Sequence, residues 1–121
     1  MTISVILRKW TGRIRTAHED EYVDYIVGTG LQDYGRTPGN LGYEMLLRDL
    51  GNGETEVSTI SWWDSMDSIR AFAGDQPELA RYYPEDDKYL LHRPLHVEHH
   101  RVIASELRVP QVAPPSRRPR T

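Results

Sequence analysis

The sequence predicts an α+β fold in which four antiparallel strands form one sheet and two helices cover one face of it. The 121-residue chain has the size of one domain. Four segments alternate apolar with polar side chains, and helical spacing appears after the first and third of them. The expected order is therefore β-α-β-β-α-β, the ferredoxin-like arrangement. We expect this domain over residues 1–104 and a separate tail over residues 105–121.

The strand predictions begin with a hairpin. Residues 41–50 and 55–63 alternate, and the intervening GNGE is a turn sequence because Gly and Asn accept positive φ. Residues 3–10 also alternate and carry β-branched side chains, which predicts the first strand. We expect a turn flanked by Gly12 and Thr16 to end it.

Two segments have the pattern of amphipathic helices. Residues 17–34 carry three acidic residues in the first turn, which the helix dipole favours, although two glycines weaken the second half of the segment. The other helix starts after a cap at Asp64 or Ser65 and stops at Gly74.

The C-terminal part has less regular patterns. Residues 77–83 predict a short helical piece, residues 84–91 another helical turn, and residues 94–104 the fourth strand. The tail holds four arginines against one glutamate, a local charge of +3 within a total of −3. Its four prolines prevent a core of its own. It is either disordered or lies across an acidic surface of a partner.

Composition excludes several classes of protein. The charge of −3 provides no basic field for nucleic acid. The absence of cysteine excludes disulfides and thiolate chemistry. No apolar run is long enough to span a membrane, and the N-terminus lacks the pattern of a signal peptide. We therefore expect a cytoplasmic protein without a membrane partner.

The first three strands carry apolar residues on both faces. Helices can cover one face of the sheet, which leaves the other bare. The economical way to bury that second face is a homodimer in which two sheets meet.

Two adjacent tryptophans, Trp62 and Trp63, end the third strand. Because strand side chains alternate, they point to opposite faces, one toward a cavity under the helices and one toward the dimer seam. Simple core packing explains them equally well.

Polar candidates for a site are tyrosines, arginines and histidines. A tyrosine hydroxyl can orient a phenolic ligand, or it can lie at an element end in water. The tyrosines considered are Tyr22, Tyr25, Tyr43, Tyr82, Tyr83 and Tyr89. Arg70, Arg81 and Arg101 either bind a substrate anion or pair with nearby acids. The sequence Glu85-Asp86-Asp87 is expected to be a solvated acidic turn.

Four of the five histidines lie between residues 92 and 100. Glu98 could share an ion with His96 or His100, but no third ligand is indicated, so we predict no metal site. A general base at His99 or His100 is favoured, because one of these neighbours must face inward. The alternative is a surface or interface role.

Three short motifs resemble those of the antibiotic biosynthesis monooxygenase-like family, of the dimeric α/β barrel superfamily. They are Trp63-Asp64-Ser65 followed by Phe72, Pro38-Gly39-Asn40 before the second strand, and Tyr82-Tyr83-Pro84 before the fourth. The resemblance covers about residues 3–104. It implies a homodimer, a small cavity between sheet and helices, and for some members oxidation of phenolic or polycyclic aromatics by dioxygen without a cofactor.

The resemblance also implies roles for individual residues. Trp63 matches a cavity tryptophan, whereas Thr59 and Ile69 stand where cofactor-free members have an asparagine and a tyrosine. Heme-degrading members have an axial histidine where this chain reads PELARYY, so heme is not expected.

Together these observations predict a cofactor-independent monooxygenase acting on a small aromatic molecule, with dioxygen as co-substrate. The predicted catalytic residues are His99, His100 and Tyr82, and the predicted substrate-binding residues are Trp63, Tyr22, Tyr43, Thr59, Ile69, Phe72 and Arg81. A cyclase or isomerase in the same cavity, or a non-catalytic small-molecule-binding or stress-associated protein, remains open.

Overall fold

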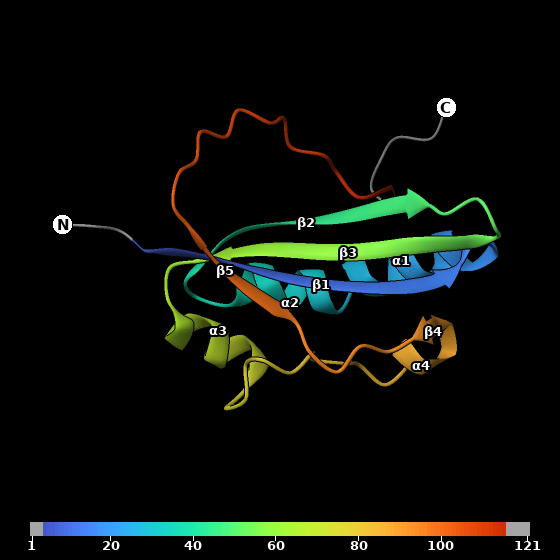
Figure 1. Ribbon diagram of the computed structural model, residues 1–121, viewed down its shortest axis with the longest axis horizontal. Helices are drawn as coiled ribbons and strands as arrows, with labels where there is room; N and C mark the ends of the chain where they lie inside the picture. Colours follow the sequence, from blue (N-terminus) through green and yellow to red (C-terminus); the bar gives the residue numbers. More distant parts are fainter. Residues whose placement is uncertain (1–3, 116–121) are drawn as a thin grey trace.

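A computed structural model describes residues 4–115 and shows one antiparallel sheet with helices on one face (Figure 1). The strands are β1 (Val5–Arg15), β2 (Asn40–Asp49), β3 (Glu54–Trp63), β4 (Leu90–His92) and β5 (Glu98–Val102). Their order is β2-β3-β1, and β4 and β5 pair with the two ends of β1. The predicted α+β, ferredoxin-like arrangement is confirmed.

The helices lie along one side of this sheet. They are η1 (Thr16–His18), α1 (Glu19–Val27), α2 (Gly30–Arg36), α3 (Met66–Ala73) and α4 (Asp86–Tyr89). In Figure 1, α1 and α2 run behind the sheet. Between these layers is a core that contains Ile14, Tyr22, Val57, Trp63 and Ile69, each at most 1% exposed. This core fixes the inner face of the sheet as the face that can hold a site.

Strand β1 is longer than predicted and runs through Gly12 without a turn. The indole of Trp10 lies over Gly12, so that a Cβ there would be 2.7 Å from two ring carbons. Gly12 is therefore a close-approach position within a strand and not a break.

The long helix predicted over residues 17–34 is two helices. The chain breaks at Gly28 and Thr29, and Thr29 Oγ1 donates to the carbonyl of Tyr25 at 2.8 Å. The predicted helical piece at 77–83 is wrong, because this segment is irregular and forms only a bridge between Leu79 and His96.

The predicted fourth strand over residues 94–104 is present as the shorter β5, and the further strand β4 (Leu90–His92) was not predicted, because it begins within the helical turn expected over residues 84–91. β5 pairs with the N-terminal half of β1, and β4 pairs with Arg13 and Ile14 near its other end. Because β1 has 11 residues, two short strands share its free edge. Pro94, which lacks an N–H donor, lies between them.

Other local predictions are confirmed. The hairpin of β2 and β3 turns through Gly51 and Gly53, with φ of 80° and 82°. Ser65 caps α3 by accepting the N–H of Ser68 at 3.1 Å, and Gly74 ends it with φ of 96°.

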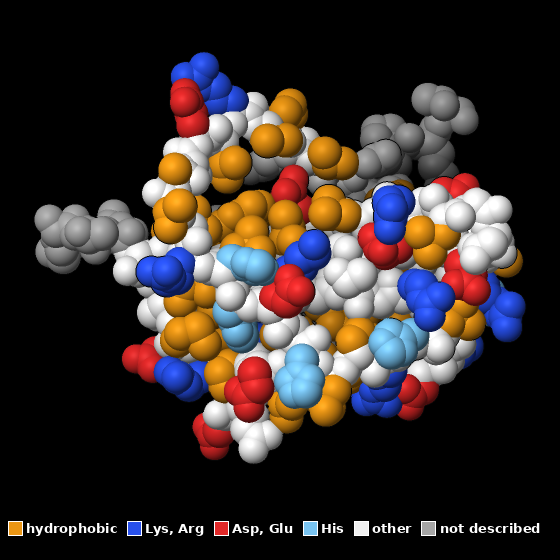
Figure 2. Space-filling view, in the orientation of Figure 1, with side chains coloured by type: hydrophobic (Ala, Val, Ile, Leu, Met, Phe, Trp, Pro, Cys, Tyr) orange, Lys and Arg blue, Asp and Glu red, His pale blue; other side chains and the backbone are white. Residues whose placement is uncertain are grey.

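The outer face of the sheet carries apolar side chains. Trp63 is fully buried on the inner face, where it pairs with Ile6. The neighbouring pair Leu7–Trp62 therefore points to the outer face, where Leu46 is 45% exposed. From Ile103 to Pro114 the chain forms no helix or strand and arches away from the sheet (Figure 1). Hydrophobic side chains gather beneath the arch in Figure 2. No helix of the described residues is long and apolar enough to cross a membrane.

Candidate functional site

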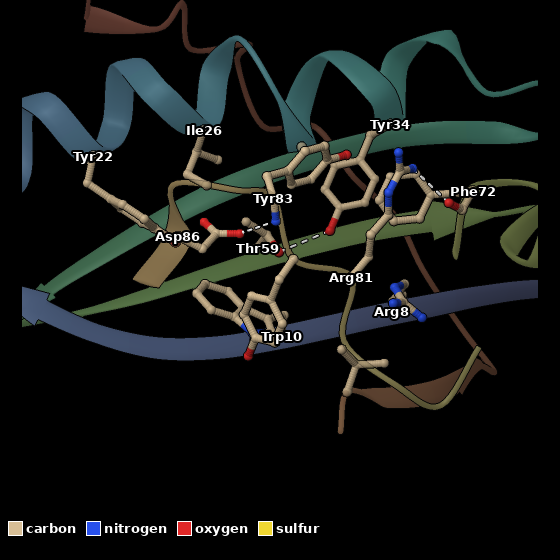
Figure 3. A pocket seen from close by; sticks show the side chains of 13 residues that line it. Arg8, Trp10, Tyr22, Ile26, Tyr34, Thr59, Phe72, Arg81, Tyr83 and Asp86 are labelled. Atoms are coloured by element: carbon tan, nitrogen blue, oxygen red, sulfur yellow. Dashed lines mark hydrogen bonds between the residues drawn. The ribbon is translucent and has the colours of Figure 1, made fainter. Parts of the chain in front are cut away.

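A cavity of about 50 Å³ lies between the inner face of the sheet, the helices and the irregular segment 77–86 (Figure 3). Every layer of the fold contributes to its wall. The lining residues are Arg8, Trp10, Tyr22, Ile26, Gly30, Tyr34, Thr59, Phe72, Arg81, Tyr82, Tyr83, Asp86 and Val97. The site is thus strongly aromatic, with two cations and one carboxylate.

Tyr34 and Thr59 form a buried polar pair in the cavity wall. Tyr34 Oη and Thr59 Oγ1 are 3.1 Å apart (Figure 3). The Tyr34 ring packs on Phe72, with centroids 4.7 Å apart, and Trp63 contacts both rings from behind. A hydroxyl pair in an otherwise aromatic wall can donate one hydrogen bond to a ligand oxygen.

Trp63 is fully buried but does not line the cavity. Its Nε1 donates to Ser61 Oγ at 2.8 Å, and its ring supports Tyr34 and Phe72. Its side chain therefore acts as a second layer that fixes the aromatic wall.

Asp86 is the carboxylate of the cavity, and it is only 3% exposed. Its Oδ2 accepts the backbone N–H of Tyr83 at 2.6 Å, whereas Oδ1 has no hydrogen-bond partner. Among the described residues, Asp86 Oδ1 is the sole buried side-chain nitrogen or oxygen atom without a hydrogen-bond partner. Burial raises the pKa of Asp86 above its ordinary value. A buried carboxylate with an unused oxygen has the properties of a general base.

The phenol of Tyr22 also lines the cavity, and burial and the nearby Asp86 raise the pKa of Tyr22. Tyr22 therefore stays protonated. The Tyr82 hydroxyl already makes hydrogen bonds within the protein: it accepts Trp10 Nε1–H at 3.1 Å and donates to the carbonyl of Pro94. Burial raises the pKa of Tyr82 as well.

Arg81 crosses the cavity wall beside Phe72. Its guanidinium lies 4.9 Å from the centre of the Phe72 ring, and its Nη2 is 3.2 Å from Asp33 Oδ2. Tyr83 Oη donates to the same carboxylate oxygen at 2.5 Å, and burial raises the pKa of Tyr83. The charge of Arg81 is thus balanced by Asp33.

Arg8 is the second cation, and it is 2% exposed. Its Nη1 donates to the carbonyl of Pro77 at 2.5 Å, and its Nη2 donates to the carbonyl of Leu79 at 3.2 Å. Nη1 also lies 3.0 Å from Nε2 of His99. Burial lowers the pKa of Arg8, yet a guanidinium keeps its charge at neutral pH.

Five predicted site residues line the cavity: Tyr22, Thr59, Phe72, Arg81 and Tyr82. The other five do not. Trp63 and Ile69 are fully buried core, and Tyr43 is 40% exposed on β2. His99 faces inward beside Arg8 but lies outside the lining, and burial lowers its pKa.

His100 lies on the outer face of β5, opposite Leu7, with its Nε2 3.1 Å from Glu98 Oε1. The sheet separates this position from the cavity, so His100 cannot act on a ligand bound there. Within residues 4–115, no group of three or more metal-ligating side chains is close enough to hold an ion.

Sequence reasoning missed Arg8, Tyr34 and Asp86. The solvated acidic turn expected at 85–87 is wrong for Asp86, because α4 turns it inward while Glu85 and Asp87 stay exposed. The signal was available: Asp86 and Tyr89 are three residues apart, so they share a helix face with a large aromatic.

Comparisons with known proteins address the fold. No protein-family model matches the sequence, and no curated protein sequence matches it. Among solved structures, a Bacillus cereus protein assigned to the antibiotic biosynthesis monooxygenases aligns over 88% of this chain and 99% of its own, with 17% identity and a TM-score of 0.54. The chain has the fold of the antibiotic biosynthesis monooxygenase-like proteins.

Two other structures share this antibiotic biosynthesis monooxygenase fold. A Shewanella oneidensis protein matches with a TM-score of 0.56 and 10% identity, over 84% of this chain and 93% of its own. A heme-degrading protein of Mycobacterium tuberculosis matches with a TM-score of 0.53 and 12% identity, over 87% of this chain and 98% of its own.

Two of the motifs that suggested the antibiotic biosynthesis monooxygenase-like family meet at one corner. The backbone N–H of Asp64 donates to the carbonyl of Gly39 at 3.0 Å. Asn40 Oδ1 accepts the N–H of Gly42 at 3.1 Å, and Asp64 Oδ1 accepts the Ser68 hydroxyl at 2.6 Å. These motifs therefore build the β3–α3 corner, and among their residues only Phe72 lines the cavity.

Proposed function

We propose that this protein is a cofactor-independent monooxygenase that oxidises a phenolic or polycyclic aromatic substrate with dioxygen. One observation carries the proposal: the buried Asp86, with its unpartnered Oδ1, lines an aromatic cavity. This geometry supports removal of a proton from a bound carbon or oxygen acid. Asp86 replaces the histidines as our candidate base.

The proposed reaction begins with proton transfer to Asp86 Oδ1. The resulting carbanion or enolate is electron-rich and reacts directly with dioxygen. For a substrate methylene group, the new peroxide loses water to leave a carbonyl, so the substrate is the reductant and one oxygen atom leaves as water. The aromatic wall would exclude bulk water, and the Tyr34–Thr59 pair would donate a hydrogen bond to the developing anion.

An aromatic substrate requires the wall to move. A cavity of about 50 Å³ is smaller than a benzene ring requires. The irregular residues 77–85 supply Arg81, Tyr82 and Tyr83, and the one-turn helix α4 that follows supplies Asp86, so no strand ladder or long helix holds this part of the wall. We therefore propose that ligand entry displaces this segment and that its return closes the site.

We also propose that the protein is a homodimer. The outer face carries Leu7, Trp62 and Leu46 with no helix over them, and Figure 2 shows hydrophobic side chains on this face. The arch carries Leu107, Val109 and other apolar side chains that are at least 64% exposed. A second copy would bury the sheet face and the arch together.

The proposed activity is tested by oxygen uptake. Purified protein is incubated with anthrone and with a panel of single-ring and multi-ring phenols, and the uptake is compared with that of heat-denatured protein. We expect catalysed uptake with a carbonyl product for at least one substrate, and a marked loss in Asp86→Asn. Product formation without oxygen would instead indicate an isomerase or cyclase. A sharp Soret band on hemin addition would contradict the cofactor-free proposal.

A further inference from the structure

We infer that Arg8 forms an oxyanion subsite at the end of the cavity opposite Asp86, which holds the negatively charged oxygen of a ligand that binds as an anion or becomes one when Asp86 removes its proton. The inference rests on the proposed function, because it assigns the charge of the molecule held in the same cavity. The ligand class is an aromatic oxyanion, either a carboxylate or the ionised oxygen of a phenol or enolate.

The first argument is the charge of Arg8. Buried cations are normally paired, because an isolated charge is costly to remove from water. Among residues 4–115, no carboxylate lies within 4.0 Å of the Arg8 guanidinium. Its partners are two carbonyls and the ring of His99, and the Tyr34 hydroxyl also interacts with it, but none of these groups is a carboxylate. The positive charge is therefore available to a ligand.

The second argument is the contrast with Arg81. Both guanidiniums lie near the Phe72 ring, at 5.8 Å for Arg8 and 4.9 Å for Arg81. Asp33 balances Arg81, as its Nη2–Oδ2 distance of 3.2 Å shows. Within the described part of the chain, Arg8 has no such carboxylate, although it is the more deeply buried of the two. A ligand anion would complete the pairing at Arg8.

The third argument is position. Figure 3 places Arg8 and Asp86 at opposite ends of the lined space, with Tyr34 and Phe72 toward the Arg8 end. A ring held between these ends would present an acidic proton to Asp86 and, to Arg8, the oxygen that carries the negative charge once this proton is removed. In an aromatic ketone, deprotonation at one side of the ring system moves negative charge to the oxygen at the other. The two ends thus suit one conjugated ligand.

The test is a binding comparison that needs no turnover. Benzoate and benzamide have nearly the same shape but differ in charge, and their dissociation constants are measured by calorimetry or tryptophan fluorescence. We expect benzoate to bind wild-type protein about tenfold more tightly than benzamide, as expected for one charge-assisted hydrogen bond. Arg8→Gln should abolish the preference, and Arg8→Lys should keep part of it.

A further arm separates the two sources of the oxyanion. Binding of 4-nitrophenol is measured below and above its own pKa, with benzamide as the control for titration of the protein. Tighter binding of the ionised form supports an ionised-hydroxyl source, and a preference limited to benzoate supports a carboxylate source. Equal affinity of wild-type protein for benzoate and benzamide, together with equal affinity for the neutral and ionised forms of 4-nitrophenol, would overturn the inference, whether or not Arg8→Gln folds. Absence of oxygen uptake would contradict only the proposed function.

Discussion

Tyr34 on α2 and Thr59 on β3 join the helical layer to the sheet through hydroxyls 3.1 Å apart. The pair lies at the cavity wall, and Thr59 occupies the position for which the family resemblance implies an asparagine. The Tyr34–Thr59 pair therefore provides a hydrogen-bond donor at the position where an asparagine amide would otherwise provide one. Because both residues are buried, the interaction is measurable as a coupling energy.

We predict that Tyr34→Phe and Thr59→Val are coupled by about 1 kcal/mol in the free energy of unfolding. Each single change removes the same hydrogen bond, so the double variant should lose less than the sum of the two. Chemical denaturation of the four proteins measures this. Strict additivity would show that the hydroxyl contact contributes nothing.

The corner at Gly39 should not accept a side chain. A Cβ there would be 2.0 Å from Ser68 Oγ, and φ is 93°. We expect Gly39→Ala to lower the free energy of unfolding by about 2 kcal/mol or more. Gly51→Ala is the matched control, because φ is 80° and no atom lies within 4 Å of the added Cβ. Equal losses in both variants would contradict the steric part of this explanation.

The proposed dimer predicts a face-specific effect of charge. Leu46 and Leu47 are 45% and 43% exposed, but they lie on opposite faces of β2. Leu46→Glu should weaken dimerisation at least tenfold, roughly 1.4 kcal/mol, whereas Leu47→Glu should leave it largely unchanged. Sedimentation velocity across a dilution series distinguishes the two. A wild-type monomer at every concentration would exclude the dimer.

The buried Asp86 predicts a dependence of stability on pH. Burial raises the pKa of Asp86 in the folded state, so the folded protein holds this proton to higher pH than the unfolded chain. Below the ordinary aspartate pKa, Asp86 is protonated in both the folded and the unfolded state, and burial of its charge costs no stability. As pH rises toward and through the raised pKa, the folded state must hold a buried charge, which lowers the free energy of unfolding. Asp86→Asn should gain about 1 kcal/mol over wild type at neutral pH and nothing in acid. A constant difference across pH would contradict this linkage.

The same shift predicts the pH profile of turnover. A base must be ionised, so kcat/KM should rise with pH to a plateau, with a midpoint above the ordinary aspartate pKa. Steady-state rates between acid and neutral pH measure this midpoint. A pH profile of kcat/KM with its midpoint at the pKa of a histidine would instead favour His99 as the base.

Much of the fold could be predicted because its signals are local. The glycines of the 51–53 turn and the Ser65 cap act within a few residues, so sequence patterns reveal them. Gly12 was misread because its neighbour Trp10, and not a turn, requires the missing side chain. The additional strand β4 depends on the length of β1, which no local pattern encodes.

The site was harder to predict because its residues come from every layer. Aromatic residues near the β3–α3 corner were found, but Trp63 proved to support the wall from behind. The exposed acidic neighbours of Asp86 indicated a solvated turn, and the apolar residues on both faces of the first strand gave no reason to single out Arg8. Burial of a charge is a tertiary property, so only the assembled fold reveals it.

The most direct measurement is proton removal by Asp86 in the absence of oxygen. A substrate deuterated at its acidic carbon, such as anthrone, is incubated anaerobically in ordinary water, and deuterium loss is followed by NMR. We predict that wild-type protein accelerates the loss and that Asp86→Asn reduces the acceleration by about 100-fold or more. Equal exchange in both proteins, with oxygen uptake retained by the variant, would contradict the assignment of Asp86 as the base.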